Sequence, residues 1–174
     1  MLDGQIIAVF NNKDFDTLKL LYKLYSPIKD EGLKPIANEF KFYLIQSGKA
    51  IITNASQQCE AAGEKESSIK FVLNNSGIIE KLLEMHVYYK EMVEQCFGKD
   101  PLFTRQLQLA FQEFVNNDIG KHPMAELFAN YTDKLMKKGG MKLDADSQKD
   151  VLDNVISLFS YLIDKDLFLM VHRN

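Results

Sequence analysis

The chain has 174 residues, of which 46% are hydrophobic, 11% aromatic and 26% charged, and its formal net charge is -3. This length allows one domain that buries roughly 70% of its unfolded surface, and 4 Pro and 9 Gly are too few for a linker or a low-complexity protein. The slightly acidic balance argues against nucleic acid or an anionic membrane as a partner.

Short apolar runs such as Ile6–Phe10 predict no transmembrane span. The N-terminus lacks the basic region of a secretory signal. Cys59 and Cys96 lie far apart without a CxxC spacing, which suits a reducing compartment. We therefore expect a soluble protein of the cytoplasm or nucleus.

Apolar residues recur at helical spacing along almost the whole chain. The first predicted helix spans 14–25, and a turn that contains Gly32 follows it. The second runs over about 33–61, with Pro35 in its first turn. Gly48 lies in this helix at a position where a neighbouring helix could approach closely. Its apolar stripe consists of Ile36, Phe40, Tyr43, Leu44, Ile51, Ile52 and Ala55.

The third predicted helix covers about 69–97, and residues 74–77 leave two readings open, one long helix or two shorter ones. Its face consists of Ile79, Leu82, Leu83, His86, Tyr89, Val93, Cys96 and Phe97. Gly98 stops it. Asp100 is the expected N-cap of the fourth helix, with Pro101 in the first helical position. The fourth stripe consists of Phe103, Leu107, Ala110, Phe111 and Phe114.

His122-Pro123 opens the fifth predicted helix, which carries Leu127, Phe128, Tyr131 and Leu135 and is closed by Lys137-Lys138 and Gly139-Gly140. The sixth starts near Asp144 and carries Val151, Leu152, Val155, Ile156, Phe159, Leu162 and Ile163. No segment alternates with period two, and no tandem repeat is visible. The pattern predicts an all-α bundle of about six helices.

The search for catalytic or ligand-binding motifs yields little. The glycine pair at 139–140 has no Lys-Ser/Thr after it, so it is not a phosphate-binding loop. The three histidines lack metal-ligand spacing. Residues 144–149 begin like a calcium loop, but Lys149 stands where glycine is required. His86 and Cys96 lie on one apolar stripe, and a core role is favoured over a thiol-dependent enzyme because no third group accompanies them. We expect no cofactor, no metal and no catalytic activity.

Three segments, in order, resemble motifs of the cullin family. The first runs from Asp100-Pro-Leu-Phe103 to Ala110-Phe111-Gln-Glu-Phe114-Val-Asn116. The second is Glu126-Leu127-Phe-Ala-Asn-Tyr131-Thr-Asp133-Lys-Leu135-Met-Lys-Lys138. The third is Tyr161-Leu-Ile-Asp164-Lys165-Asp166-Leu-Phe168. Residues that follow the family's order also occur earlier in the chain: Tyr22, Ile28, Gly32, Leu33, Phe40 and Gly48.

The resemblance assigns a structural role to the motif residues. They are Tyr22, Gly32, Phe40, Phe103, Ala110, Phe111, Phe114, Asn116, Glu126, Leu127, Tyr131, Asp133, Leu135, Tyr161, Asp164, Lys165, Asp166 and Phe168. It implies the third five-helix repeat of a right-handed cullin stalk over 1–140, and over 141–174 a helix that joins it to a C-terminal cullin homology domain. We interpret Asp164 as an N-cap or as an acid in the last turn of the preceding helix, and we expect Phe168 to return to the core.

The resemblance further implies a non-catalytic scaffold of a cullin–RING ubiquitin ligase, in ubiquitin-dependent protein catabolism and of the F-box-ligase class. Its partners would be a BTB-fold adaptor with an F-box-type receptor, a RING-box protein and a cullin exchange factor, with no nucleic acid and no membrane. The first repeat and the C-terminal domain have no counterpart in this sequence, so we expect a truncated cullin rather than a divergent one. The alternative function is a generic helical tether of a trafficking complex.

Overall fold

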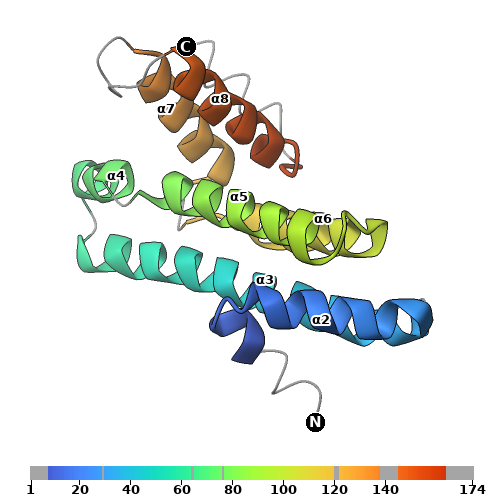
Figure 1. The fold of residues 1–174 in the computed structure, drawn as a ribbon. Coiled ribbons are helices and arrows are strands. Elements are labelled where there is room, and N and C mark those ends of the chain that lie inside the picture. Colours follow the sequence, from blue (N-terminus) through green and yellow to red (C-terminus); the bar gives the residue numbers. More distant parts are fainter. Residues whose placement is uncertain are drawn as a thin grey trace. The chain divides into compact units, whose positions relative to one another are not determined.

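The computed structural model describes residues 8–28, 30–63, 65–75, 77–119, 122–137 and 145–163. In these ranges the regular structure is helical, apart from an isolated antiparallel bridge between Ile119 and His122 (Figure 1). The elements in chain order are α2 (Phe15–Tyr25), the 3₁₀ turn η1 (Ser26–Ile28), α3 (Asp30–Ala61), α4 (Glu66–Asn75), α5 (Ile78–Cys96), α6 (Pro101–Val115), α7 (Met124–Met136) and α8 (Ala145–Phe159). The expected all-α fold is confirmed.

The break between α4 and α5 decides between the two readings of the third predicted helix. Asn75 ends α4 and Ile78 begins α5. Gly77 lies between them with a φ of 64°, a left-handed conformation that glycine adopts without the steric cost of a Cβ. The segment therefore forms two helices.

The start of α3 differs from the prediction. Because this helix begins at Asp30, Gly32 is helical rather than part of a turn, and Pro35 lies in the second turn. Proline there removes the backbone bond to the carbonyl of Glu31. Gly32 is required for packing instead, since a Cβ would lie 2.8 Å from the carbonyl oxygen of Tyr25 and 3.0 Å from Cβ of Ile28.

The chain forms two compact units, each assembled from segments that are distant in sequence. Unit 1 contains residues 1–47 and 86–113, and unit 2 contains 48–85 and 114–174. Helices α3, α5 and α6 each contribute residues to both units. Among the described helices, none is both long enough and apolar enough to cross a membrane.

The core of unit 1 is rich in aromatic residues. Its most deeply buried side chains are Phe10, Leu18, Ile36, Phe40, Leu44, Phe97, Phe103 and Phe111. The rings of Phe97 and Phe103 stack with centroids 3.9 Å apart, across the corner between α5 and α6. The predicted stripe of α3 is therefore confirmed at Ile36, Phe40 and Leu44.

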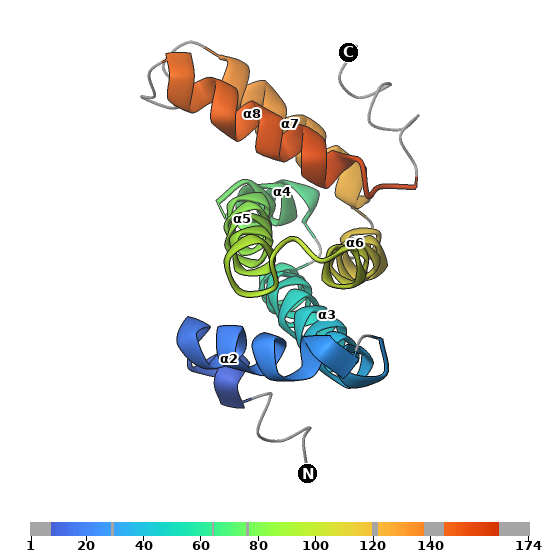
Figure 2. The same cartoon turned by 45° about the vertical axis from the view of Figure 1, so that its right-hand side comes forward.

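The core of unit 2 lies among α7, α8 and the parts of α3, α5 and α6 that belong to it. Its buried side chains include Ile52, Leu82, Phe114, Val115, Leu127, Phe128, Leu135, Val155, Leu158 and Leu162. Helices α7 and α8 lie side by side (Figures 1 and 2). The predicted stripe is wrong at Ile156, which is 62% exposed because the apolar arc of α8 is wider than the face that α7 covers. It is also wrong at Ile163, which is 79% exposed and follows the end of α8 at Phe159.

Candidate functional site

Asn116 joins the first family motif to the third. It follows the last residue of α6, and its side-chain Nδ2 donates a hydrogen bond of 2.9 Å to the backbone carbonyl of Tyr161. Its Oδ1 accepts a hydrogen bond of 2.8 Å from the backbone N–H of Ile163. Both ends of one amide are thus used on the segment that follows α8. We call this pair of bonds the Asn116 clamp.

The Asn116 clamp replaces helical bonds where α8 ends. After Phe159 the backbone tightens, with Tyr161 donating to Leu158 and Leu162 donating to Phe159. Carbonyls in a last helical turn need partners outside the helix, and a side-chain amide meets that need for Tyr161. The Tyr161 side chain is partly buried, and burial raises the pKa of its phenol. Its motif position therefore serves packing as well as backbone recognition.

The second motif covers most of α7, with buried and exposed residues among its members. Leu127 and Leu135 are buried. The hydroxyl of Thr132, also buried, donates a hydrogen bond of 2.8 Å to the carbonyl of Phe128. The carbonyl of Leu135 accepts a 2.9 Å hydrogen bond from Nε2 of Gln148, which ties the end of α7 to α8. Tyr131 is half-buried, and burial is the main reason that its pKa is raised.

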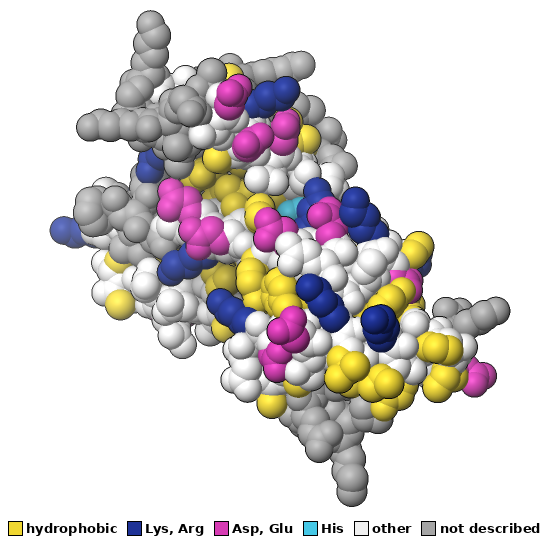
Figure 3. Space-filling view, in the orientation of Figure 1, with side chains coloured by type: hydrophobic (Ala, Val, Ile, Leu, Met, Phe, Trp, Pro, Cys, Tyr) yellow, Lys and Arg dark blue, Asp and Glu magenta, His cyan; other side chains and the backbone are white. Residues whose placement is uncertain are grey.

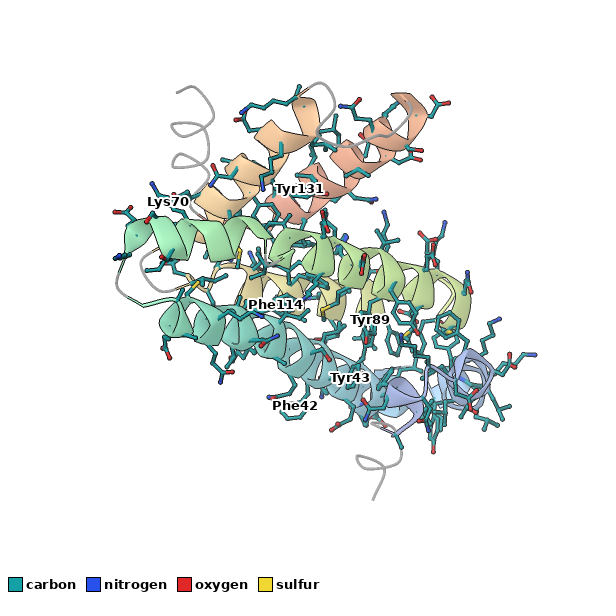
Figure 4. All side chains as sticks on the ribbon, turned by 90° about the vertical axis from the view of Figure 1, so that its left-hand side faces the viewer. Phe42, Tyr43, Lys70, Tyr89, Phe114 and Tyr131 are labelled. Atoms are coloured by element: carbon teal, nitrogen blue, oxygen red, sulfur yellow. The ribbon has the colours of Figure 1, made fainter. Side chains whose placement is uncertain are left out.

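The acidic residues of this motif lie at a charged groove between α7 and α4. Glu126 pairs with His122 at 3.6 Å, and Asp133 pairs with Lys137 at 3.5 Å. The groove has a volume of about 330 Å³, and Figure 4 labels Lys70 and Tyr131 in this region. Its lining consists of Lys70, His122, Glu126, Leu127, Asn130, Asp133, Lys134 and Lys137. Cations and anions alternate there, so the charges select no particular ligand.

Gly48 and Phe114 form a close helix contact within unit 2. A Cβ on Gly48 would lie only 2.4 Å from Cδ1 of Phe114, far below any real contact distance. The absence of a side chain on α3 therefore lets the Phe114 ring, labelled in Figure 4, lie directly against the α3 backbone. The close approach that the sequence predicted at Gly48 is confirmed, and its partner is a motif residue.

Phe40 is the centre of the aromatic cluster of unit 1. Its ring is fully buried and lies about 6 Å, centroid to centroid, from four others. They belong to Phe10, Tyr89, Phe97 and Phe103. Tilted and edge-on ring pairs of this kind contribute beyond the area that they bury. Two of the quoted motif residues, Phe40 and Phe103, therefore meet directly.

Asp100 has two functions at the corner between α5 and α6. Its Oδ1 accepts a 2.9 Å hydrogen bond from the N–H of Leu102, which confirms the predicted N-cap. Its Oδ2 accepts a hydrogen bond of 2.8 Å from the hydroxyl of Tyr22, and this bond attaches α2 to the corner. Burial, together with the Asp100 carboxylate, raises the pKa of Tyr22, so the phenol stays a neutral donor.

His86 and Cys96, the two groups weighed as a thiol-enzyme pair, pack into the core of unit 1. His86 is 3% exposed, and its ring stands edge-on to Phe111 with centroids 4.9 Å apart. The Cys96 thiol lies 3.7 Å from the carbonyl oxygen of Phe15, and burial raises its pKa. A raised pKa lowers the fraction of reactive thiolate. In the part of the chain that the structure describes, no three metal-ligating side chains form a cluster.

Four motif positions, Asp164, Lys165, Asp166 and Phe168, lie outside the described residues. The sequence analysis missed the partner of Asn116, because a bond to a backbone carbonyl leaves no trace in side-chain types. It also missed Gln148, a polar residue at the start of an amphipathic helix. The second function of Asp100 depends on Tyr22, 78 positions earlier.

The regular structure of the described residues is helical apart from one isolated bridge, and the motif residues among them pack in the cores, cap helices or hydrogen-bond to the backbone. The sequence model of the "Cullin alpha solenoid domain" family matches residues 1–174, so the chain belongs to the cullin family.

Curated relatives agree with this membership. The chain is 33% identical to Cullin-1 of Oryza sativa subsp. japonica over 169 residues and 32% identical to Cullin-2 of Arabidopsis thaliana over 163 residues. It is also 33% identical to the Putative cullin-like protein 1 of Arabidopsis thaliana over 169 residues. These alignments cover 95%, 92% and 96% of this chain and 22% of each relative. The chain thus spans about a fifth of the length of these relatives.

Proposed function

We propose that this chain is a rigid, non-catalytic spacer in the scaffold of a cullin–RING ubiquitin ligase. In such a ligase, the spacer holds a substrate adaptor at one end apart from the RING-box protein and its charged ubiquitin-conjugating enzyme at the other. The effective concentration of ubiquitin near the substrate then depends on a fixed separation. The adaptor with its F-box-type receptor, the RING-box protein and the exchange factor would bind parts of a full-length cullin outside this segment.

One observation carries the proposal: the quoted family residues that the structure describes act mainly inside the fold. Phe40, Phe103, Phe111 and Phe114 are fully buried, and Asn116 binds backbone. Well-packed interiors deform little, which is what a spacer requires. A ubiquitin ligase acts on cytoplasmic and nuclear substrates, and we propose those compartments for the protein.

The test uses a full-length cullin that contains this segment, reconstituted with its adaptor and RING-box protein. Replacing Phe111 and Phe114 with Asp places charges in the core, and we expect a loss of ubiquitin transfer with unchanged adaptor affinity. The milder Asn116→Ala should reduce transfer less and broaden the particle dimensions measured by X-ray scattering. Phe42→Asp is the matched control, because Phe42 is 52% exposed. Equal transfer by the double Asp variant would contradict the spacer role.

A pull-down from cell extract with the same full-length protein separates this function from the alternative tether. Recovery of a RING-box protein supports the ligase. Recovery of membrane-coat components without a RING-box protein contradicts it.

A further inference from the structure

The corner between α2 and α3 is bent although the chain at its start is still helical. Ser26, the residue after α2, has a φ of −62° and a ψ of −33°, and its N–H donates to the carbonyl of Tyr22, four residues earlier. Residues 26–28 then form η1, whose 3₁₀ dihedral angles lie close to those of an α-helix. In Figures 1 and 2 the chain turns back at this corner instead of continuing straight. A small change of backbone angles there would join α2, η1 and α3 into one long helix.

Two residues at the corner act against that straight form. Pro27 has no N–H to donate, and in a continuous helix its ring would collide with the carbonyl of Lys23. Gly32 permits the bend, because a Cβ there would lie 2.8 Å from the carbonyl oxygen of Tyr25 and 3.0 Å from Cβ of Ile28. In a straight helix the Tyr25 carbonyl would lie about 10 Å away along the axis, so this collision would disappear.

The segment before the bend is attached through a small number of anchoring side chains. In α2 one residue, Leu18, is fully buried, and Tyr22 bonds to Asp100 at 2.8 Å. Figure 3 shows hydrophobic side chains on the outer surface near the corner between α2 and α3. Elements with few buried contacts open locally at a lower free energy than core helices. We call residues 8–28 the α2 arm.

The surface that receives the α2 arm belongs to helices that stay with the rest of the chain. The ring of Phe15 lies 5.7 Å from that of Tyr88 on α5, and the ring of Phe10 lies 5.6 Å from that of Phe40 on α3, centroid to centroid. A second copy of the chain presents the same receiving residues in the same arrangement. It can therefore accept the arm with the same contacts, which is the condition for exchange of an element between two copies.

We propose that the α2 arm docks either on its own copy or on a second copy of this chain, and that Gly32 and Pro27 select the first. In the monomer the corner is bent. In the alternative state the corner is straight, and two copies exchange their α2 arms in a closed dimer. That dimer contains two straight corners, so the effect of a substitution at the corner counts twice in the dimerisation constant. The inference is independent of the ligase function.

Refolding from urea at a high concentration, about 0.5 mM, tests the proposal, because each arm can then meet its own copy or another. Sedimentation velocity measures the dimer fraction. The wild-type chain should be monomeric. Gly32→Ala should raise the dimerisation constant at least about 20-fold, because Ala is favoured over Gly in a helix interior and the collision is absent from the straight form.

Pro27→Ala should raise the dimerisation constant further, because proline disfavours a helix interior more than glycine does. Pro27 is exposed, so this variant tests the corner even where Gly32→Ala destabilises the whole fold. Gly48→Ala is the matched control in the same helix. Its collision with Phe114 is present in both states, so it should not favour the dimer.

Isotope-filtered NMR identifies the copy that holds the arm. A dimer of the Pro27→Ala protein is prepared from equal amounts of chains with labelled and unlabelled aromatic residues. Exchange predicts cross-peaks between the Tyr22 ring of one chain and the rings of Phe97 and Phe103 of the other, whose centroids lie 6.0 Å and 6.1 Å from that of Tyr22 in the monomer.

Four results would overturn the proposal. A double variant, Gly32→Ala with Pro27→Ala, that stays monomeric excludes the exchanged state. A wild-type chain that dimerises as strongly as the variants shows that Gly32 and Pro27 do not select the monomer. A dimer with these cross-peaks only within chains is formed through another surface. Dimerisation of Gly48→Ala equal to that of Gly32→Ala assigns the effect to lost stability instead of the corner.

Discussion

Several side chains of this protein form hydrogen bonds with main-chain groups, and Asn116 is the clearest case. Asn116→Ala removes both bonds of the clamp, to the Tyr161 carbonyl and from the Ile163 amide. Water can replace part of the loss because Ile163 is exposed. We therefore expect a decrease of about 1–2 kcal/mol in the free energy of unfolding, measured by urea denaturation.

Two variants accompany that measurement. Asn117→Ala, at the exposed next residue, should leave the free energy of unfolding unchanged within about 0.5 kcal/mol. Asn116→Asp keeps the acceptor for Ile163 but loses the donor to Tyr161, so it should fall between wild type and Asn116→Ala. Identical stability of all three variants would mean that the clamp contributes nothing.

The buried His86 makes the stability of the folded protein depend on pH, and the direction of this dependence follows from its pKa. Burial, with a smaller effect of Lys90, lowers the pKa of His86 from 6.5 to about 4 in the folded state. The unfolded chain binds a proton near pH 6.5 while the folded chain does not, so stability is complete above pH 6.5 and falls as the pH decreases toward 4. The lowered pKa corresponds to a decrease of about 3 kcal/mol in the free energy of unfolding between pH 6.5 and pH 4.

His86→Leu separates this effect from carboxylate titration. We expect the wild type to lose about 2–3 kcal/mol more than the variant between pH 7 and pH 4.5, measured by urea denaturation at both values. The comparison within each protein removes the packing change that the substitution itself causes. Parallel pH profiles for the two proteins would show that His86 is not the titrating group.

The contact between α3 and the Phe114 ring depends on the absence of a side chain at Gly48. In an exposed helix interior, replacing Gly with Ala stabilises by about 1 kcal/mol. At position 48 the added methyl group would collide with the Phe114 ring, so we expect a net destabilisation of about 1–3 kcal/mol by thermal or urea unfolding.

A smaller side chain at 114 provides the control. Phe114→Leu opens space above α3, so Gly48→Ala should cost less in the Phe114→Leu background than in the wild type. A double-mutant cycle measures this coupling. Additive effects would contradict a direct contact between the two residues.

A second prediction about contacts between elements concerns the hydrogen bond between Tyr22 and Asp100 at the corner between α5 and α6. Tyr22→Phe retains the ring contacts with Phe97 and Phe103 but loses the hydrogen bond to Asp100, and it should cost about 1–2 kcal/mol by urea unfolding. Asp100→Ala should cost more, because it also removes the α6 cap. Asp100→Asn keeps one acceptor oxygen, for the Leu102 N–H, but its Nδ2 cannot accept from the Tyr22 hydroxyl, so it should cost less than Asp100→Ala.

For the molecule as a whole, the domain boundary expected at residue 140 remains a prediction that truncation can test. Bonds cross that position within unit 2, from Gln148 to Leu135 and from Asn116 to the segment after α8. The stretch beyond it also buries Val155, Leu158 and Leu162. A chain ending at 140 should therefore be less stable than one ending at 163 by at least about 3 kcal/mol. Equal unfolding midpoints would support an independent domain up to 140.

The sequence predicted the helices well because their apolar spacing is regular and long. The stripes of the third and fourth predicted helices are buried throughout, and the Asp100 cap and the Gly48 approach are confirmed. Prediction was weakest where the burial or hydrogen bonding of a residue depends on a residue elsewhere in the chain. Spacing alone gives the width of an apolar arc but not which part a neighbour covers, so Ile156 was placed in the core. The bonds of Asn116 and Tyr22 join positions 45 and 78 residues apart, which no local pattern encodes.

The Asn116 clamp also affects how this chain tolerates evolutionary change. Its two partners are main-chain atoms, which every amino acid supplies, so substitutions at 163 leave the recognition intact unless they introduce proline, which has no N–H to donate. The number of residues between α8 and position 163, in contrast, affects the clamp directly. An insertion or deletion of one residue between α8 and 163 would shift the carbonyl and the amide relative to Asn116. We therefore expect the length of this segment to tolerate change less well than its composition.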